Sequence, residues 1–286
     1  MTSITKKMIR AFVEGQYWRH PIRALRIFRA ETARRNSGYR TAWNAVGKDA
    51  GWAFTMMNGS PDEETLRRTG AAMAQRLRTS LALDRQHRVL ELGCGVARIG
   101  RELAPHVGQW HGADIAPSIL KIARGRTIHL PNTHFHEITN TRLPFADGSF
   151  DRAYCHLVLF HLDKEDLFIY LNELRRVLLP GGLVYFDTWN LMHPEGWNRF
   201  LWELDHNRHK RVKPAHRNQF ATAEEIRLYT EKAGLAPLHV LYESFWIQTI
   251  AAKPGPGVDL VGLKNQISGI EELVPRGKWY YDDAPV

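Results

Sequence analysis

The chain has 286 residues, enough for one full α/β core and for further segments outside that core. Its 44% hydrophobic and 24% charged residues are ordinary for a globular protein, and no apolar run reaches the length of a membrane span. Its two cysteines form neither a disulfide framework nor a zinc site, and the N-terminus lacks the apolar core of a secretory signal, so we expect a reducing, cytoplasmic setting.

The net charge of +9 lies almost wholly at the N-terminus. Residues 1–40 hold ten Lys or Arg against Glu14 and Glu31, whereas the other 246 residues carry 29 basic and 28 acidic side chains. This near-neutral remainder argues against a nucleic-acid substrate. Pro21 separates two short amphipathic helices, and we expect residues 1–64 to form a basic helical arm that caps the active site. The alternatives are a patch for an acidic partner, a membrane surface or RNA, a cleaved organelle-targeting segment, and a basic face that is merely solvated.

Helical and strand patterns alternate along the rest of the chain. The first of these helices, at about 62–79, begins after Ser60 and Pro61 with early acids. Such alternation predicts a parallel sheet covered on both faces, and the tight connection between the last two strands makes them antiparallel. Strands are expected at about 87–92, 109–114, 133–137, 151–157, 182–188, 237–243 and 245–252. Further helices are expected near 97–106, 117–125, 163–178 and 222–233.

The helix near 163–178 has the clearest pattern. Asp163 stands where an N-cap is expected, and Pro180-Gly181-Gly182 is expected to end the helix. Apolar residues recur at helical spacing, which predicts one buried face. These residues are Leu167, Leu171, Leu174 and Leu178.

A glycine turn follows the first strand, in Val89-Leu90-Glu91-Leu92-Gly93-Cys94-Gly95-Val96-Ala97-Arg98. The glycines let the backbone approach a ligand, and Asp114, 21 residues after Gly93, ends the second strand where it can bind a ribose. A dinucleotide fingerprint would have a third glycine at Arg98, and Glu91 would repel a pyrophosphate. The pattern therefore predicts a site for a nucleoside that carries an ammonium or sulfonium charge.

This turn resembles the first motif of class I S-adenosylmethionine-dependent methyltransferases, with Ala97 in place of their usual third glycine. The segments Leu143–Asp151, Arg176–Gly182 and Glu231–Leu235 resemble later motifs of the small-molecule, type 11-like members, in the same order. The resemblance implies a doubly wound, Rossmann-like sheet of seven strands with the last antiparallel, in a domain of residues 65–253, with S-adenosylmethionine as cofactor.

The resemblance also implies which residues hold the cofactor. Asp114 would bind the ribose, His156 would line the methionine end, and Arg98 would pair with the cofactor carboxylate or be a surface charge. The family's acidic triplet after the third strand is Ile138-Thr139-Asn140 here, which leaves the adenine contact open. The candidate cofactor residues are Glu91, Gly93, Cys94, Gly95, Arg98, Asp114, Ile115, Asn140 and His156.

The acceptor side has two candidate catalytic residues. A hydroxyl acceptor needs a base near neutral pH, and His161 matches a histidine common in the family, although it could instead position its loop. Asp187, at the end of the fifth strand, could orient the acceptor or join a metal with Asp163; we expect no metal. We expect O-methylation of a small molecule such as a sugar or a secondary metabolite. The alternatives are N- or C-methylation, an RNA or protein methyltransferase using the basic arm, and a nucleoside-binding module without activity.

An insertion at about 189–221 is expected to form a lid, because loops after strand ends shape the ligand crevice. Its aromatic residues could stack on an acceptor or only fasten the lid, and its histidines do not have the spacing of a zinc site. The insertion contains Trp189, Trp197, Phe200, Trp202, His193, His206, His209 and His216. The sequence assigns no role to the tail, residues 254–286.

Overall fold

The computed structural model describes residues 38–267 except Val212 and His216. Most of the basic arm, His216 and the end of the tail therefore lie outside the described residues. Within the expected cap, residues 38–46 are helical and α3 spans Ala50–Asn58. No described helix combines the length and the apolar character needed to cross a bilayer.

One mixed sheet forms the centre of the molecule, in the order β3-β2-β1-β4-β5-β8-β7. Its strands are β1 (Arg88–Leu92), β2 (Gln109–Asp114), β3 (Thr133–Glu137), β4 (Phe150–Cys155), β5 (Leu178–Asn190), β7 (Ala236–Leu241) and β8 (Trp246–Ala252). Strand β8 is antiparallel to both of its neighbours, while β1 to β5 pair in parallel. The expected seven-stranded sheet with an antiparallel last strand is thus confirmed. A two-residue strand, β6 (Phe220–Ala221), adds an eighth member on β5.

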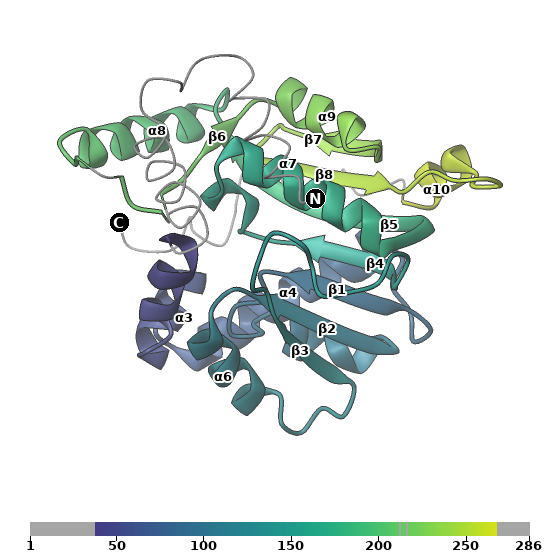
Figure 1. The fold of residues 1–286 in the computed structure, drawn as a ribbon, viewed down its shortest axis with the longest axis horizontal. Helices are drawn as coiled ribbons and strands as arrows, with labels where there is room; N and C mark the ends of the chain where they lie inside the picture. Colours follow the sequence, from purple (N-terminus) through teal and green to yellow (C-terminus); the bar gives the residue numbers. More distant parts are fainter. Residues whose placement is uncertain (1–37, 212, 216, 268–286) are drawn as a thin grey trace, which may run out of the picture.

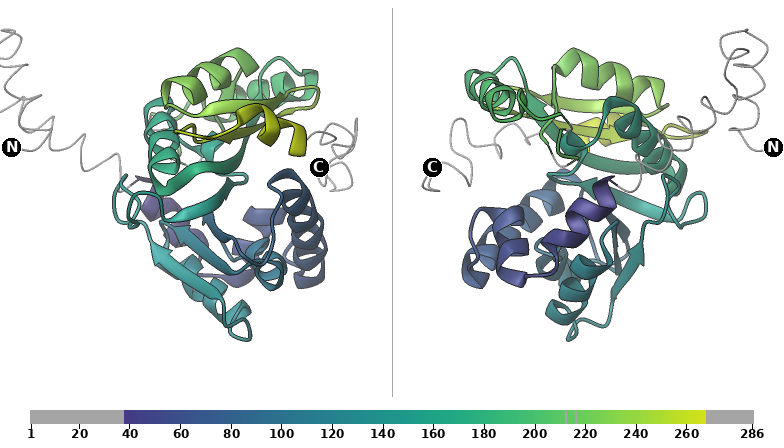
Figure 2. Two further views of the ribbon diagram at one scale, coloured as in Figure 1. Left: turned by 90° about the vertical axis from the view of Figure 1, so that its right-hand side faces the viewer. Right: turned by 60° about the vertical axis from the view of Figure 1, so that its left-hand side comes forward.

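Helices cover both faces of this sheet (Figures 1 and 2). They are α4 (Glu63–Ser80), α5 (Gly100–Leu103), η1 (Ala104–His106), α6 (Pro117–Arg126), η2 (Leu159–His161), α7 (Lys164–Val177), α8 (Pro194–Asn207), α9 (Ala223–Lys232) and α10 (Leu260–Gln266). Successive residues of a strand point to opposite faces, so Val89 packs in the cluster with α4 and α5 while Leu90 packs in the cluster with α7 and α9. The alternating strands and helices of the sequence thus form two hydrophobic layers, one on each face of the sheet.

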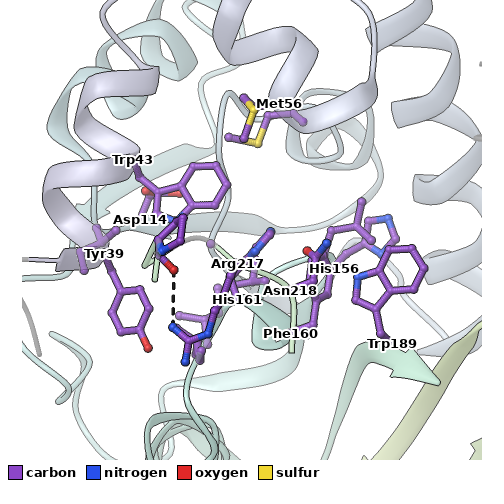
Figure 3. A pocket seen from close by; sticks show the side chains of 18 of the residues that line it. Tyr39, Trp43, Met56, Asp114, His156, Phe160, His161, Trp189, Arg217 and Asn218 are labelled. Atoms are coloured by element: carbon purple, nitrogen blue, oxygen red, sulfur yellow. Dashed lines mark hydrogen bonds between the residues drawn. The ribbon is translucent and has the colours of Figure 1, made fainter. Parts of the chain in front are cut away.

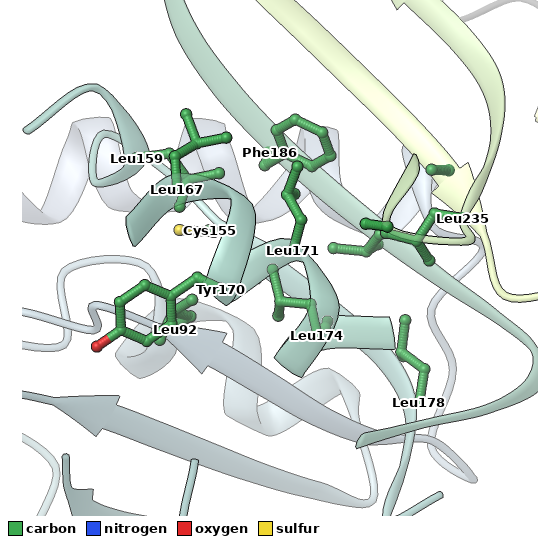
Figure 4. Close-up of a cluster of buried hydrophobic side chains, with 14 of the residues drawn as sticks. Leu92, Cys155, Leu159, Leu167, Tyr170, Leu171, Leu174, Leu178, Phe186 and Leu235 are labelled. Carbon is green, nitrogen blue, oxygen red and sulfur yellow. The ribbon is translucent and has the colours of Figure 1, made fainter. Parts of the chain in front are cut away.

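The cluster under α7 contains the predicted apolar face of that helix (Figure 4). Leu167, Leu171 and Leu174 are buried there, and so is Leu178, which already belongs to β5. Fully burying a leucine side chain contributes roughly 1.5–3 kcal/mol. The predicted face is confirmed, and it fixes α7 against the strands that end at the site.

Two local expectations were wrong, and a third was confirmed in position only. The helix expected near 97–106 is only α5 followed by the 3-10 turn η1, because Ala97 has a left-handed φ of 56° and cannot belong to a helix. Pro180-Gly181-Gly182 does not end α7, since β5 starts at Leu178 and runs through it. Asp163 occupies the N-cap position without a side-chain cap; its carboxylate instead accepts hydrogen bonds from Arg217 (2.8 Å) and Gln219 (3.1 Å).

Candidate active site

The glycine turn after β1 is fixed against the end of β2. The backbone N–H groups of Gly93 and Cys94 both donate to the Ala113 carbonyl, at 2.7 and 3.1 Å. Gly93 has a φ of 72°, and a Cβ there would lie 2.3 Å from a methyl group of Val158. Glycine is therefore required for both backbone conformation and space. The turn brings its backbone close to the loop that follows β4.

Asp114 is bound into this turn from the end of β2. It is buried, and its carboxylate accepts hydrogen bonds from the backbone N–H groups of Gly95 and Ala116, each at 2.9 Å. Burial raises the pKa of Asp114, while these N–H groups oppose the rise. Each carboxylate oxygen has further acceptor capacity, so Asp114 can still accept hydrogen bonds from ligand hydroxyls.

Glu91 forms the floor of the turn within a buried polar chain. The Tyr154 hydroxyl donates to Glu91 Oε2 at 2.6 Å and accepts from Trp110 Nε1 at 3.0 Å. Burial raises the pKa of Glu91 to about 8, although Tyr154 and the nearby Arg98 guanidinium oppose the rise. A buried acid with this pKa ionises readily when a cation is placed beside it.

His156 and Asp187 form a pair at the ends of two neighbouring strands. His156 Nδ1 is hydrogen-bonded to Asp187 Oδ2, and both side chains are almost completely buried. Asp187 Oδ1 also accepts from the backbone N–H of Leu157 at 2.8 Å, and Tyr185 donates its hydroxyl proton towards Oδ2 at 3.2 Å. Burial lowers the pKa of His156, and the Asp187 carboxylate only partly offsets this.

From the sequence these two residues were expected to have separate roles, and their pairing was not predicted. A signal was available, because β4 and β5 pair in parallel with Tyr154 opposite Tyr185 and Cys155 opposite Phe186. His156 and Asp187 are the next positions in this register. Alignment of the two predicted strands would have placed them side by side.

His161 lies in the 3-10 turn η2 after β4, and its backbone N–H donates to the Val158 carbonyl. Its ring packs edge-on against Trp43, with centroids 5.2 Å apart, and beside Phe160 at 4.2 Å. Trp43, which comes from the helical segment before α3, was not predicted from the sequence as a site residue.

One cavity of about 700 Å³ joins these groups (Figure 3). Its walls include most of the predicted site residues, namely Glu91, Gly93, Cys94, Arg98, Asp114, Ile115, His156 and His161. Gly95 is covered by Met57 of α3, and Asp187 lies behind His156. Asn140 is exposed and accepts a hydrogen bond from the Arg142 backbone, whereas Ile138 and Thr141 line the wall in its place.

The other half of the cavity is largely aromatic. Trp189 and Trp246 pack with ring centroids 4.4 Å apart, next to Phe160 and Phe245. Helix α8 of the insertion contributes Arg199, which lies over the Trp202 ring at 4.4 Å. Neither Phe245 nor Trp246, which both line the cavity, was predicted from the sequence. Among the described residues, no three His, Cys, Asp or Glu side chains converge as metal ligands.

Comparisons with known proteins agree with this geometry. A family model described as a methyltransferase domain matches residues 89–182. Methyltransferase GfsG of Streptomyces halstedii is 32% identical over 42% of this chain and 44% of its own length. O-methyltransferase cnsE of Penicillium expansum is 31% identical over 46% of this chain and 49% of its own length. The chain thus matches less than half of either relative.

A similar fold occurs in a solved complex between the Haloferax volcanii Trm112 methyltransferase activator and a methyltransferase. The two chains share 19% identity with a TM-score of 0.59, over 74% of this chain and 98% of the other. At this identity the likeness concerns the fold. The matched domain over residues 89–182 and the methyltransferase relatives therefore identify this part of the chain as a class I S-adenosylmethionine-dependent methyltransferase domain, whose cofactor is S-adenosylmethionine.

Proposed function

We propose that this protein transfers a methyl group from S-adenosylmethionine to a hydroxyl group of a small-molecule acceptor. The observation that carries the proposal is the continuous cavity, which runs from the glycine turn to an aromatic chamber, with three histidines (His156, His161 and His206) on the cavity wall. An acceptor bound in that chamber would lie next to the cofactor, so the methyl group could pass between them without entering bulk solvent. The name of the relative cnsE, an O-methyltransferase, agrees with a hydroxyl acceptor.

The residues at the glycine turn have the chemistry that this cofactor requires. The cofactor supplies a methyl group on a positively charged sulfur. Glu91 would lie near its cationic end, and Asp114 would accept hydrogen bonds from the ribose hydroxyls. Arg98 is buried, and none of the described residues accepts a hydrogen bond from its guanidinium group, so it can pair with the cofactor carboxylate.

The aromatic half suits a small acceptor with an apolar or planar body. Trp189, Trp246 and Phe160 offer flat faces for stacking, and Arg199 on α8 lies at the edge of the same chamber. Polar contacts in this half come from Glu203 and Asn218, which bond to each other at 2.7 Å. His161 also lines the cavity, and its role as the base is the expectation drawn from the sequence.

Two measurements test the proposal. Calorimetry with S-adenosylhomocysteine should show binding to the wild type and at least a tenfold loss in Asp114→Ala, because each charge-assisted hydrogen bond contributes about 1.5–3 kcal/mol. Asp84→Ala, an exposed acid outside the cavity, is the matched control and should bind as the wild type does. Unchanged affinity in Asp114→Ala would remove this residue from the cofactor site.

A methyl-release screen over phenols, sugars and amines tests the acceptor. We expect turnover of hydroxyl compounds by the wild type. Turnover restricted to amines would replace the proposed O-methylation by N-methylation. No turnover and no binding of S-adenosylhomocysteine would contradict the proposed activity altogether.

A further inference from the structure

We propose that His156, held by Asp187, is the base that takes the proton from the acceptor hydroxyl. This inference rests on the proposed function and names its chemistry: an acceptor whose attacking oxygen must lose a proton during the reaction. It moves the catalytic role from His161 to a residue that the sequence analysis assigned to the cofactor.

The geometry leaves one nitrogen of His156 for the reaction. Nδ1 is engaged by Asp187 Oδ2, no described residue bonds to Nε2, and the side chain lines the cavity. In Figure 3, His156 lies on the side of Phe160 and Trp189, away from Asp114 and Tyr39. The ring thus lies on the aromatic side of the cavity in this view, and Arg98 of the glycine turn is close enough to influence its charge.

Asp187 is fixed well enough to hold the ring in one tautomer. Its Oδ1 accepts from the Leu157 backbone at 2.8 Å, and Tyr185, which also lies 3.2 Å from Gln248, directs its hydroxyl at Oδ2. A carboxylate on Nδ1 keeps the proton on that nitrogen and leaves the Nε2 lone pair free to accept another. The partner of His156 Nδ1 is thus a buried carboxylate with fixed contacts of its own.

The charges around His156 favour the neutral ring before the reaction. Burial, Arg98 from the turn after β1 and Arg76 from α4 all lower its pKa, and Asp187 from β5 raises it. The imidazole is therefore neutral near pH 7 and can act as a base. When it gains a proton, the adjacent Asp187 carboxylate stabilises the new positive charge.

The proposed step balances. The acceptor oxygen forms a bond to the methyl carbon, and the carbon–sulfur bond breaks with its electron pair remaining on sulfur, which becomes a neutral thioether. The hydroxyl proton passes to His156 Nε2 and is later lost to solvent. An amine acceptor could release its proton to water before attack and would not need this pair.

A purely structural role for Asp187 is the competing explanation. Leu157 has a left-handed φ of 61°, and the hydrogen bond from its N–H to Asp187 stabilises that turn. Asp187→Asn separates the two roles. The amide oxygen can still accept from Leu157, but the amide N–H donates to His156 Nδ1 and forces the ring proton onto Nε2.

The test combines nitrogen NMR with kinetics on the full chain. With ¹⁵N-labelled histidine and S-adenosylhomocysteine bound, we expect the Nδ1–H tautomer of His156 in the wild type and the Nε2–H tautomer in Asp187→Asn. With the hydroxyl acceptor that releases most methyl in the screen, kcat should fall at least 100-fold in Asp187→Asn and His156→Asn, with the affinity for S-adenosylhomocysteine within threefold. Asp151→Asn is the control, because this acid at the start of β4 also accepts a backbone N–H, from Arg88. It should retain the wild-type rate.

The pH profile then compares the two histidines. The acidic limb of kcat should lie below pH 6.5, the ordinary histidine value, and should vanish in His156→Asn while persisting in His161→Asn. An Nε2–H tautomer in the wild type overturns the inference, and so does an Asp187→Asn variant within threefold of the wild-type rate. If Asp187→Asn fails to fold, the tautomer of His156 in the wild type and the kcat of His156→Asn still test the inference. A wild type without methyl release would instead refute the proposed function.

Discussion

At the scale of single residues, burial decides the properties of Glu91. Its position in the turn was evident from the sequence, but its contacts with Tyr154 and its raised pKa come from the packing of β1 against β4 and of α4 over both. Burial brings the pKa to about 8, against an ordinary value of 4.5. Between these two pH values the folded protein keeps a proton that the unfolded chain has lost.

The stability of the protein without cofactor should therefore depend on this residue. Since the folded state binds more protons in that window, the Glu91 contribution is fully present below pH 4.5 and is lost as the pH rises towards 8, by at most about 1.4 kcal/mol per unit of pKa difference. Glu91→Gln cannot titrate, so its free energy of unfolding relative to the wild type should increase between pH 5 and pH 8. Urea denaturation at both pH values measures this difference, and a constant difference would show that Glu91 titrates normally.

At the scale of elements, the approach of α4 to the glycine turn positions Arg98. Gly70 lies in α4, and a Cβ on it would be 2.1 Å from the Arg98 carbonyl oxygen. This oxygen belongs to the backbone, so no side-chain rotation can relieve the contact. Gly125 in α6 is the opposite case, because a Cβ there meets nothing within 4 Å.

Substitution of these two glycines by alanine should change the free energy of unfolding in opposite directions. Gly70→Ala should lower the free energy of unfolding by about 1–3 kcal/mol and weaken cofactor binding, because α4 must move away from the turn. Gly125→Ala should raise it by about 0.4–1 kcal/mol, since alanine restricts the unfolded chain and is compatible with a helix. Denaturant midpoints and calorimetry with S-adenosylhomocysteine check both. A Gly70→Ala protein as stable as Gly125→Ala would contradict the close packing.

At the scale of the whole molecule, the cavity is built from segments far apart in the sequence. Trp43 before α3, His161 after β4 and Trp246 of β8 all line it. In the described part of the expected cap, Tyr39 and Trp43 stand on the cavity wall, and the Tyr39 hydroxyl accepts from the Asp163 backbone at 2.9 Å. That residues 1–64 cap the site stays a prediction. The role of residues 1–37, which carry most of the basic charge of the arm, also remains a prediction.

Removal of residues 1–37 tests that prediction. If this segment completes a cap, the acceptor KM should rise at least several-fold, while the affinity for S-adenosylhomocysteine should change little, because Glu91 and Asp114 lie elsewhere in the cavity. If it binds an anionic surface instead, turnover should survive, and salt-sensitive binding to anionic vesicles or RNA should be lost. Full activity with an unchanged acceptor KM would exclude the cap.

The sequence by itself determined the features that depend on local chemistry. The glycine turn could be identified because its backbone needs residues without a Cβ, and the predicted bounds of β2 and β3, which end at Asp114 and Glu137, match the structure to the residue. The short connection between β7 and β8 required antiparallel pairing. Local predictions were wrong where the conformation of one residue differs from the one that the pattern implies. Ala97, for example, is left-handed, and the helix after the turn is therefore shorter than predicted.

The tertiary structure decided what depends on contacts between distant segments. His156 and Asp187 are 31 residues apart and meet only because β4 and β5 are neighbours in register. Trp43 and Trp246 share a cavity although they lie at opposite ends of the described chain. The raised pKa of Glu91 comes from the loss of water around it, and a sequence specifies residues without specifying how much solvent each of them keeps.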